Sequence, residues 1–130
     1  MNVVDSSAWL EYFANGPNAS FFASAIEQTE DLLVPSLTLY EVFKLVLTQR
    51  DEGQALQAVA MMQQGTVVDP DSFIALEAAR ISHEVKLPMA DSIVLATAQV
   101  HDAPVWTQDA DFKGLAGVHY RKRKSSSPAV

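Results

Sequence analysis

Short apolar segments alternate with helical patterns along most of this chain, and this alternation limits the folds that it can adopt. Strand-like segments are expected at residues 2–5, 32–35, 66–68 and 103–107, with a weak edge strand at 118–120. Apolar residues at helical spacing occupy residues 6–14, 18–28, 36–50, 52–64, 72–85 and 88–100. Asn18, Ser36, and Asp69 or Asp71 are the residues expected to cap three of these helices. Strands that alternate with helices are typical of a parallel sheet covered by helices on both faces. We therefore predict a three-layer α/β/α fold around a central, mainly parallel sheet of four to five strands.

The size and composition of the chain favour a single domain inside the cell. Its 130 residues, 48% of them apolar, are enough for one hydrophobic core and leave no room for a second. The apolar runs are far shorter than the roughly 20 residues that span a bilayer, so we expect no membrane attachment. Cysteine is absent, which excludes disulfides and thiolate metal sites. With no signal-peptide pattern before the first strand, a cytoplasmic location is expected.

The charge of the chain is unevenly distributed. The net charge is −7, yet four of the nine basic residues are consecutive, at residues 121–124. The remaining body would repel a phosphate backbone unless metal ions or the tail offset its charge, and it would also suit a basic partner. Residues 121–130 are basic and then rich in Ser and Pro, which predicts a flexible tail. The tail either contacts phosphates or is a solvated end, and we prefer the second interpretation.

Four carboxylates lie where a fold of this kind brings side chains together. Asp5 follows the first strand, Glu41 lies in the helix after the second strand, Asp91 begins an apolar helix, and Asp109 follows the fourth strand. Side chains at the carboxyl ends of parallel strands converge in one crevice. Carboxylates gathered in this way repel one another unless a cation or protons neutralise them. Oxygen ligands without Cys or His favour Mg²⁺ or Mn²⁺, so the pattern predicts a metal-dependent enzyme.

Each of these acids also has a simpler explanation. Asp5 can cap the helix that follows it, and Asp109 can serve as a turn residue. Glu41 can be a solvated helix residue that pairs with Lys44. Asp91 is different, because nearly every residue after it is apolar, and a carboxylate at the mouth of a buried helix is costly without a partner. The metal-site interpretation therefore depends on the acids as a set.

Four segments, in order along the chain, resemble those of the PIN-domain ribonucleases, and among these the VapC-type toxins of toxin–antitoxin modules. They are residues 3–9 (Val-Val-Asp-Ser-Ser-Ala-Trp), 35–42 (Pro-Ser-Leu-Thr-Leu-Tyr-Glu-Val), 87–98 (Leu-Pro-Met-Ala-Asp-Ser-Ile-Val-Leu-Ala-Thr-Ala) and 107–112 (Thr-Gln-Asp-Ala-Asp-Phe). The resemblance covers residues 1–120, which we expect to form a PIN domain, followed by the tail 121–130. Residues 52–86 carry no segment that matches the family.

The resemblance implies an activity, a metal site and partners. The implied reaction is cleavage of structured RNA, such as tRNA or ribosomal RNA, by a metal-activated water. The implied ligands of one or two Mg²⁺ or Mn²⁺ ions are Asp5, Glu41, Asp91 and Asp109, with Asp111 as a second candidate for the last position and with Ser6 and Thr107 in support. Relatives are typically homodimers that a cognate antitoxin silences by placing a basic residue near the acids. We expect the dimer to form through the helices of residues 36–64.

Other classes of protein use similar residues. A receiver domain needs a paired acid at the first strand and a late Lys, and a haloacid-dehalogenase-like phosphatase needs Asp-x-Asp where this chain has Asp5-Ser6-Ser7. A von Willebrand-type adhesion site needs a Ser where Trp9 stands. The more serious alternative is a catalytically inactive PIN-like scaffold that binds RNA or a protein. The complete set of acids argues against that alternative.

Overall fold

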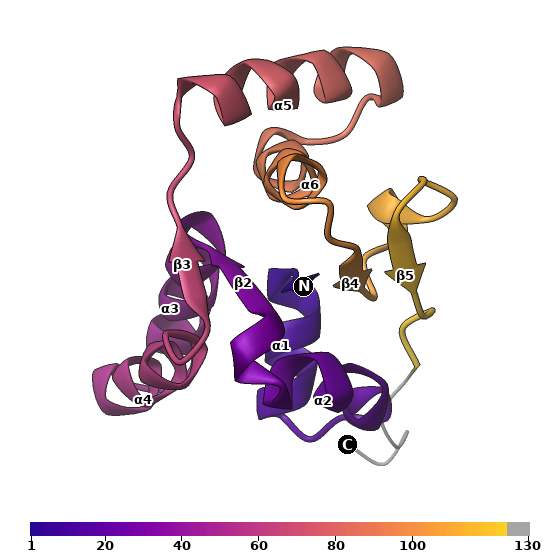
Figure 1. Cartoon of the computed structure of the whole chain (residues 1–130). Coiled ribbons are helices and arrows are strands. Elements are labelled where there is room, and N and C mark those ends of the chain that lie inside the picture. The colour runs from indigo at the N-terminus through magenta and orange to yellow at the C-terminus, as the bar shows by residue number, and fades with distance from the viewer. Residues whose placement is uncertain (125–130) are drawn as a thin grey trace.

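The computed structural model describes residues 1–124, which form one parallel sheet and the helices that cover it (Figure 1). The strands are β1 (Asn2–Val4), β2 (Leu32–Pro35), β3 (Thr66–Val68), β4 (Val105–Thr107) and β5 (Val118–Tyr120). The α-helices are α1 (Ser6–Phe13), α2 (Ala19–Glu27), α3 (Ser36–Gln49), α4 (Glu52–Met62), α5 (Ser72–Val85) and α6 (Met89–Val100). Two short 3-10 helices, η1 (Thr29–Asp31) and η2 (Ala110–Phe112), complete the chain.

The sheet confirms the predicted fold class. Its five strands run in the order β3-β2-β1-β4-β5, and every neighbouring pair is parallel. The central strand β1 pairs through Val3 with Leu33 of β2 on one side and with Val105 of β4 on the other. After β1 the chain builds the sheet toward β3 and then crosses to the opposite side for β4 and β5. The strand order therefore reverses between β1 and β4, which is where open α/β sheets place their binding crevice.

Helices cover both faces of the sheet because the strand residues alternate between them. Val4 packs with residues of α1–α4, whereas its neighbour Val3 packs with residues of α6. The α1–α4 face has a core that includes Val4, Ala8, Trp9, Phe22, Ile26, Leu32, Val34, Val42 and Met62. The other face has a core that includes Val3, Leu33, Leu87, Val94, Leu95, Val105 and Phe112. Helix α5 packs on the outer side of α6 through Ile74 and Ala78, so this side is two helices deep.

The helix starts agree with the sequence in part. Strand β1 ends at Val4, one residue earlier than expected. Asp5 caps α1 and Asp71 caps α5. The cap expected at Ser36 is wrong, whereas Asn18 does stand at the capping position of α2. The Asn18 side chain makes no capping hydrogen bond, and α3 is preceded by Pro35, with Ser36 as its first residue. Asn18 makes a long-range contact instead of a capping bond, because its side-chain amide donates to the Lys122 carbonyl of the C-terminal segment.

Two expectations concern the outside of the domain. No helix within residues 1–124 has the length and the apolar character needed to cross a bilayer. The domain end expected near residue 120 stays a prediction. The flexibility expected for the tail concerns residues 125–130 in large part, and these lie outside the described residues.

Candidate metal centre

The carboxyl ends of β1 and β4, together with the starts of α3 and α6, bring the predicted acids into one crevice. Carboxylate oxygens of Asp91, Asp109 and Asp111 lie within 4.8 Å of one another. Asp5 and Glu41 lie outside this group of three, yet both are close enough for their charges to raise the pKa of Asp91. The structure thus gathers all five acids, and both Asp109 and Asp111 belong to the group of three that includes Asp91. Which of them bind a metal stays a prediction.

Asp5 is held at the floor of this crevice by hydrogen bonds to both of its carboxylate oxygens. Oδ1 accepts from the Ser7 hydroxyl at 2.8 Å and from the Ala8 backbone N–H at 3.0 Å. Oδ2 accepts from the Thr107 hydroxyl at 2.7 Å. Asp5 is only 3% exposed, and this burial raises its pKa to about 6, although the hydrogen bonds act in the opposite direction. Asp5 therefore caps α1, as the simpler explanation requires, and also belongs to the acid cluster.

Thr107 connects two of the acids. Its hydroxyl donates to Asp5 and accepts the backbone N–H of Asp109 at 2.9 Å. Asp109 in turn accepts the backbone N–H of Asp111 through Oδ1 at 2.9 Å, which caps the short helix η2. The positions of Asp5 and Asp109 are therefore coupled through one side chain at the end of β4. This contact gives the sequence-predicted Thr107 a physical role in orienting the acids.

The pKa values of Asp91 and Glu41 are also raised. Partial burial at the start of α6 raises the pKa of Asp91 to about 7, and the charges of Asp109, Asp5, Glu41 and Asp111 add to the effect. Burial also raises the pKa of Glu41, and a hydrogen bond from Ser6 partly offsets this rise. The fold thus disfavours the ionised forms of both groups, and a bound proton or cation would stabilise them.

Within residues 1–124, no Lys or Arg side chain forms an ion pair with the acid cluster. Among residues 1–124 the one ion pair is between Arg80 and Glu77 on α5, at 3.7 Å. Several carboxylates with raised pKa values and no Lys or Arg partner are a suitable ligand set for a hard divalent cation. The donor set, made of oxygens alone, fits Mg²⁺ or Mn²⁺ better than a softer metal.

Sequence reasoning missed two residues that support this site. Ser7 donates to Asp5, and its hydroxyl also accepts the backbone N–H of Gln108 at 3.3 Å. Gln108 is buried and bonds through its side chain to Asn18. A Ser two residues after an N-cap Asp was a usable signal for Ser7. Gln108 carried no local signal, because its partners are about a hundred residues away in the sequence.

Comparisons with known proteins agree with this architecture. A protein-family model described as the PIN domain matches residues 3–118. The fold is similar to that of a toxin–antitoxin complex from Klebsiella pneumoniae, with a TM-score of 0.77 at 23% identity over 92% of this chain and 96% of that chain. VapC20 of Mycobacterium tuberculosis, described as a sarcin–ricin loop cleaving toxin, has a TM-score of 0.73 at 16% identity over 91% and 97%. DNA-bound VapBC from Salmonella typhimurium has a TM-score of 0.72 at 16% identity over 94% and 98%. A search of curated protein sequences found no match.

Proposed function

Because this chain belongs to the PIN-domain family, we propose that it is a divalent-metal-dependent endoribonuclease that hydrolyses phosphodiester bonds in structured RNA. The observation that carries the proposal is the group of acids at the ends of β1 and β4, in which the pKa values of Asp5, Glu41 and Asp91 are raised and no acid has an ion-pair partner in the described residues. Such a group is costly for a structural protein and useful for a metal-dependent hydrolase.

The residues of the crevice have distinct roles in this proposal. Asp91, Asp109 and Asp111 hold Mg²⁺ or Mn²⁺, and Asp5, oriented by Thr107, completes the negative floor. When bound, the metal supplies a Lewis acid that stabilises charge on the scissile phosphate and lowers the pKa of water. Glu41 is half-buried with a raised pKa, which suits it to accept a proton from the attacking water through its carboxylate. Ser6 interacts with Glu41 and keeps its pKa lower than burial alone would.

We further infer that the protein is the toxin of a toxin–antitoxin module in the cytoplasm. The solved structures that share its fold include a toxin–antitoxin complex and a toxin described as cleaving the sarcin–ricin loop, and this supports tRNA or ribosomal RNA as the substrate. Acids without basic partners would attract a basic residue of a cognate antitoxin. Helices α3 and α4 expose apolar side chains, which supports them as the surface of a homodimer: Tyr40, Leu47, Leu56 and Met61.

Cleavage of total RNA by the purified protein tests the proposed activity. We expect cleavage with Mg²⁺ or Mn²⁺, none with EDTA, and a loss on the order of 100-fold or more for Asp91→Asn. The matched control is Glu30→Gln, because Glu30 is an exposed acid in η1, which precedes the amino end of β2, whereas the proposed site lies at the carboxyl ends of the strands. Wild-type activity in a folded Asp91→Asn variant would contradict the metal-site assignment. Absence of cleavage by the wild type with either metal would favour an inactive PIN-like scaffold.

A further inference from the structure

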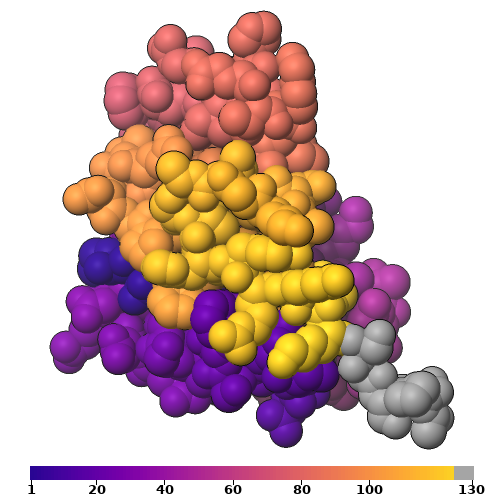
Figure 2. Space-filling view, turned by 90° about the vertical axis from the view of Figure 1, so that its right-hand side faces the viewer, coloured from indigo at the N-terminus to yellow at the C-terminus, as the bar shows by residue number. Residues whose placement is uncertain are grey.

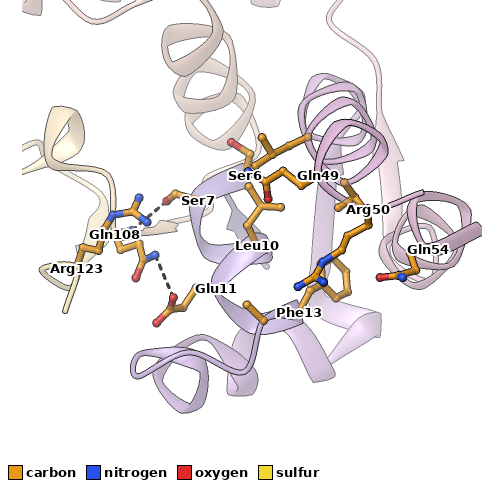
Figure 3. Close-up of a pocket in the computed structure, with 13 residues that line it drawn as sticks. Ser6, Ser7, Leu10, Glu11, Phe13, Gln49, Arg50, Gln54, Gln108 and Arg123 are labelled. Carbon is orange, nitrogen blue, oxygen red and sulfur yellow. Dashed lines mark hydrogen bonds between the residues drawn. The ribbon is translucent and has the colours of Figure 1, made fainter. Parts of the chain in front are cut away.

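A cavity of about 540 Å³ opens beside the acid crevice, between α1 and α3 (Figure 3). Three of its lining residues adjoin the acids, two by contact and one in the sequence. Ser7 donates to Asp5, Ser6 bonds to Glu41, and Gln108 directly precedes Asp109. The volume lies in the range of pockets that enclose small ligands, roughly 300–1,000 Å³. A ligand in this cavity would therefore be a direct neighbour of whatever the acids act on.

Two arginines give the cavity a positive lining in an acidic protein. Arg123 lies with Gln108 on one side of the cavity, and Arg50 lies on the other, beyond Leu10 (Figure 3). In the part of the chain that the structure describes, neither arginine is within ion-pair distance of a carboxylate. The one acid in the lining, Glu11, already accepts the Asn18 backbone N–H at 2.6 Å and the Gln108 amide at 3.4 Å. The guanidinium groups thus remain available to an anionic ligand.

The segment that carries Arg123 is attached to the domain. The Arg121 backbone N–H donates to the Thr107 carbonyl at 3.0 Å, which continues the β4–β5 pairing. The Arg121 guanidinium lies 4.1 Å from the centre of the Phe21 ring, and the buried Asn18 amide donates to the Lys122 carbonyl at 3.0 Å. Figure 2 shows this yellow C-terminal stretch packed against the indigo N-terminal part of the chain. These contacts place the Arg123 side chain at the cavity.

We propose that this cavity binds an unpaired nucleotide of the RNA substrate next to the scissile phosphate, with Arg50 and Arg123 contacting its phosphates. This inference rests on the proposed ribonuclease function and adds the region of the substrate that the protein holds. The remaining lining suits a nucleotide, because Phe13 and Leu10 offer apolar surface to a base and the Gln49 amide offers a donor and an acceptor to its edge. A hollow of this kind admits a base splayed out of a loop, whereas a stacked duplex does not expose one.

The arginines explain how an acidic chain can hold RNA. The net charge of −7 opposes a broad nucleic-acid surface, so the positive contacts must be concentrated. Two arginines on opposite sides of one cavity can contact successive phosphates while the metal offsets the acids beside them. In this proposal the tail contacts phosphates through Arg123. The sequence alone favoured the other interpretation, in which the tail is a solvated end.

Fluorescence anisotropy with a labelled short oligouridylate over a series of NaCl concentrations tests the subsite without using cleavage. The measurements are made on the Asp91→Asn protein with EDTA, so that the RNA stays intact. We expect Arg50→Gln and Arg123→Gln each to weaken binding about 3- to 10-fold and each to reduce the slope of log K against log[salt] by about 0.7. Arg80→Gln, the matched control on α5, removes the same charge outside the cavity and leaves both values near those of the parent.

Each result separates the possible explanations. Affinity and salt slope equal to those of the parent in both cavity variants would overturn the proposal, provided that thermal melts show unchanged folding. If the variants bind the cognate antitoxin less tightly and RNA equally well, the cavity is a protein-binding site and the proposal is wrong. If the wild type cleaves no RNA with Mg²⁺ or Mn²⁺ but both cavity variants still lose RNA affinity, the subsite stands and the nuclease assignment fails.

Discussion

Replacing Asp91 by Asn should make the metal-free protein more stable, because the substitution removes a partly buried charge that other acids surround and leaves the size of the side chain nearly unchanged. The folded state raises the pKa of Asp91 from 3.8 to about 7. A shift of this size corresponds to about 4 kcal/mol at the most, at about 1.36 kcal/mol per pKa unit. Because Asp91 is only half-buried, solvent screening reduces the expected gain to about 1–2 kcal/mol.

The sign of the effect depends on pH. Between about pH 4 and pH 7 the folded wild type binds more protons at Asp91 than the unfolded chain does, so this contribution to its stability is lost as the pH rises through that window. Asn carries no such charge. The Asp91→Asn variant should therefore match the wild type near pH 4 and exceed it most above pH 7.

Urea unfolding in EDTA across this pH range measures the difference, and Glu30→Gln controls for the loss of one exposed acid. Added Mg²⁺ or Mn²⁺ should then stabilise the wild type by about 3 kcal/mol at a hundred times the dissociation constant, and the variant much less. A variant less stable than the wild type at pH 8 in EDTA would refute the electrostatic reasoning. Equal stabilisation of both proteins by the metal would refute the assignment of Asp91 as a ligand.

Two further predictions concern the contacts around the crevice. Thr107→Val removes a hydroxyl whose hydrogen bond lowers the pKa of Asp5. The acid limb of the pH–rate profile for RNA cleavage should therefore move to higher pH. An acid limb at the wild-type pH would show that Asp5 does not control it. Asn18→Ala removes the hydrogen bonds to the Gln108 side chain and to the Lys122 carbonyl. It should lower the free energy of unfolding, measured in urea, by about 1–3 kcal/mol. An unchanged urea midpoint would mean that Asn18 does not hold the C-terminal segment.

The elements of the fold were predictable because their signals are local. Apolar residues at helical spacing identified α3 and α6, and short apolar runs identified β1 and β2, with ends that differ from the structure by at most one residue. The expected cap is wrong at Ser36, and the capping hydrogen bond is absent at Asn18. Both residue types favour helix caps, but Pro35 occupies the capping position of α3, and the buried Asn18 amide is used in a long-range contact.

The sequence by itself determined which acids stand at the ends of strands and helices, because capping, periodicity and strand length depend on neighbouring residues. Only the tertiary structure decided that β1 lies beside β4, and this placement sets Asp5 next to Thr107 and raises the pKa of Asp91 through burial and the other acids. The tertiary structure also places Arg50 and Arg123 in the lining of one cavity, although they are more than seventy residues apart in the sequence. Strand pairing and cavity shape depend on which apolar faces pack together across the whole chain, and no local pattern contains that information.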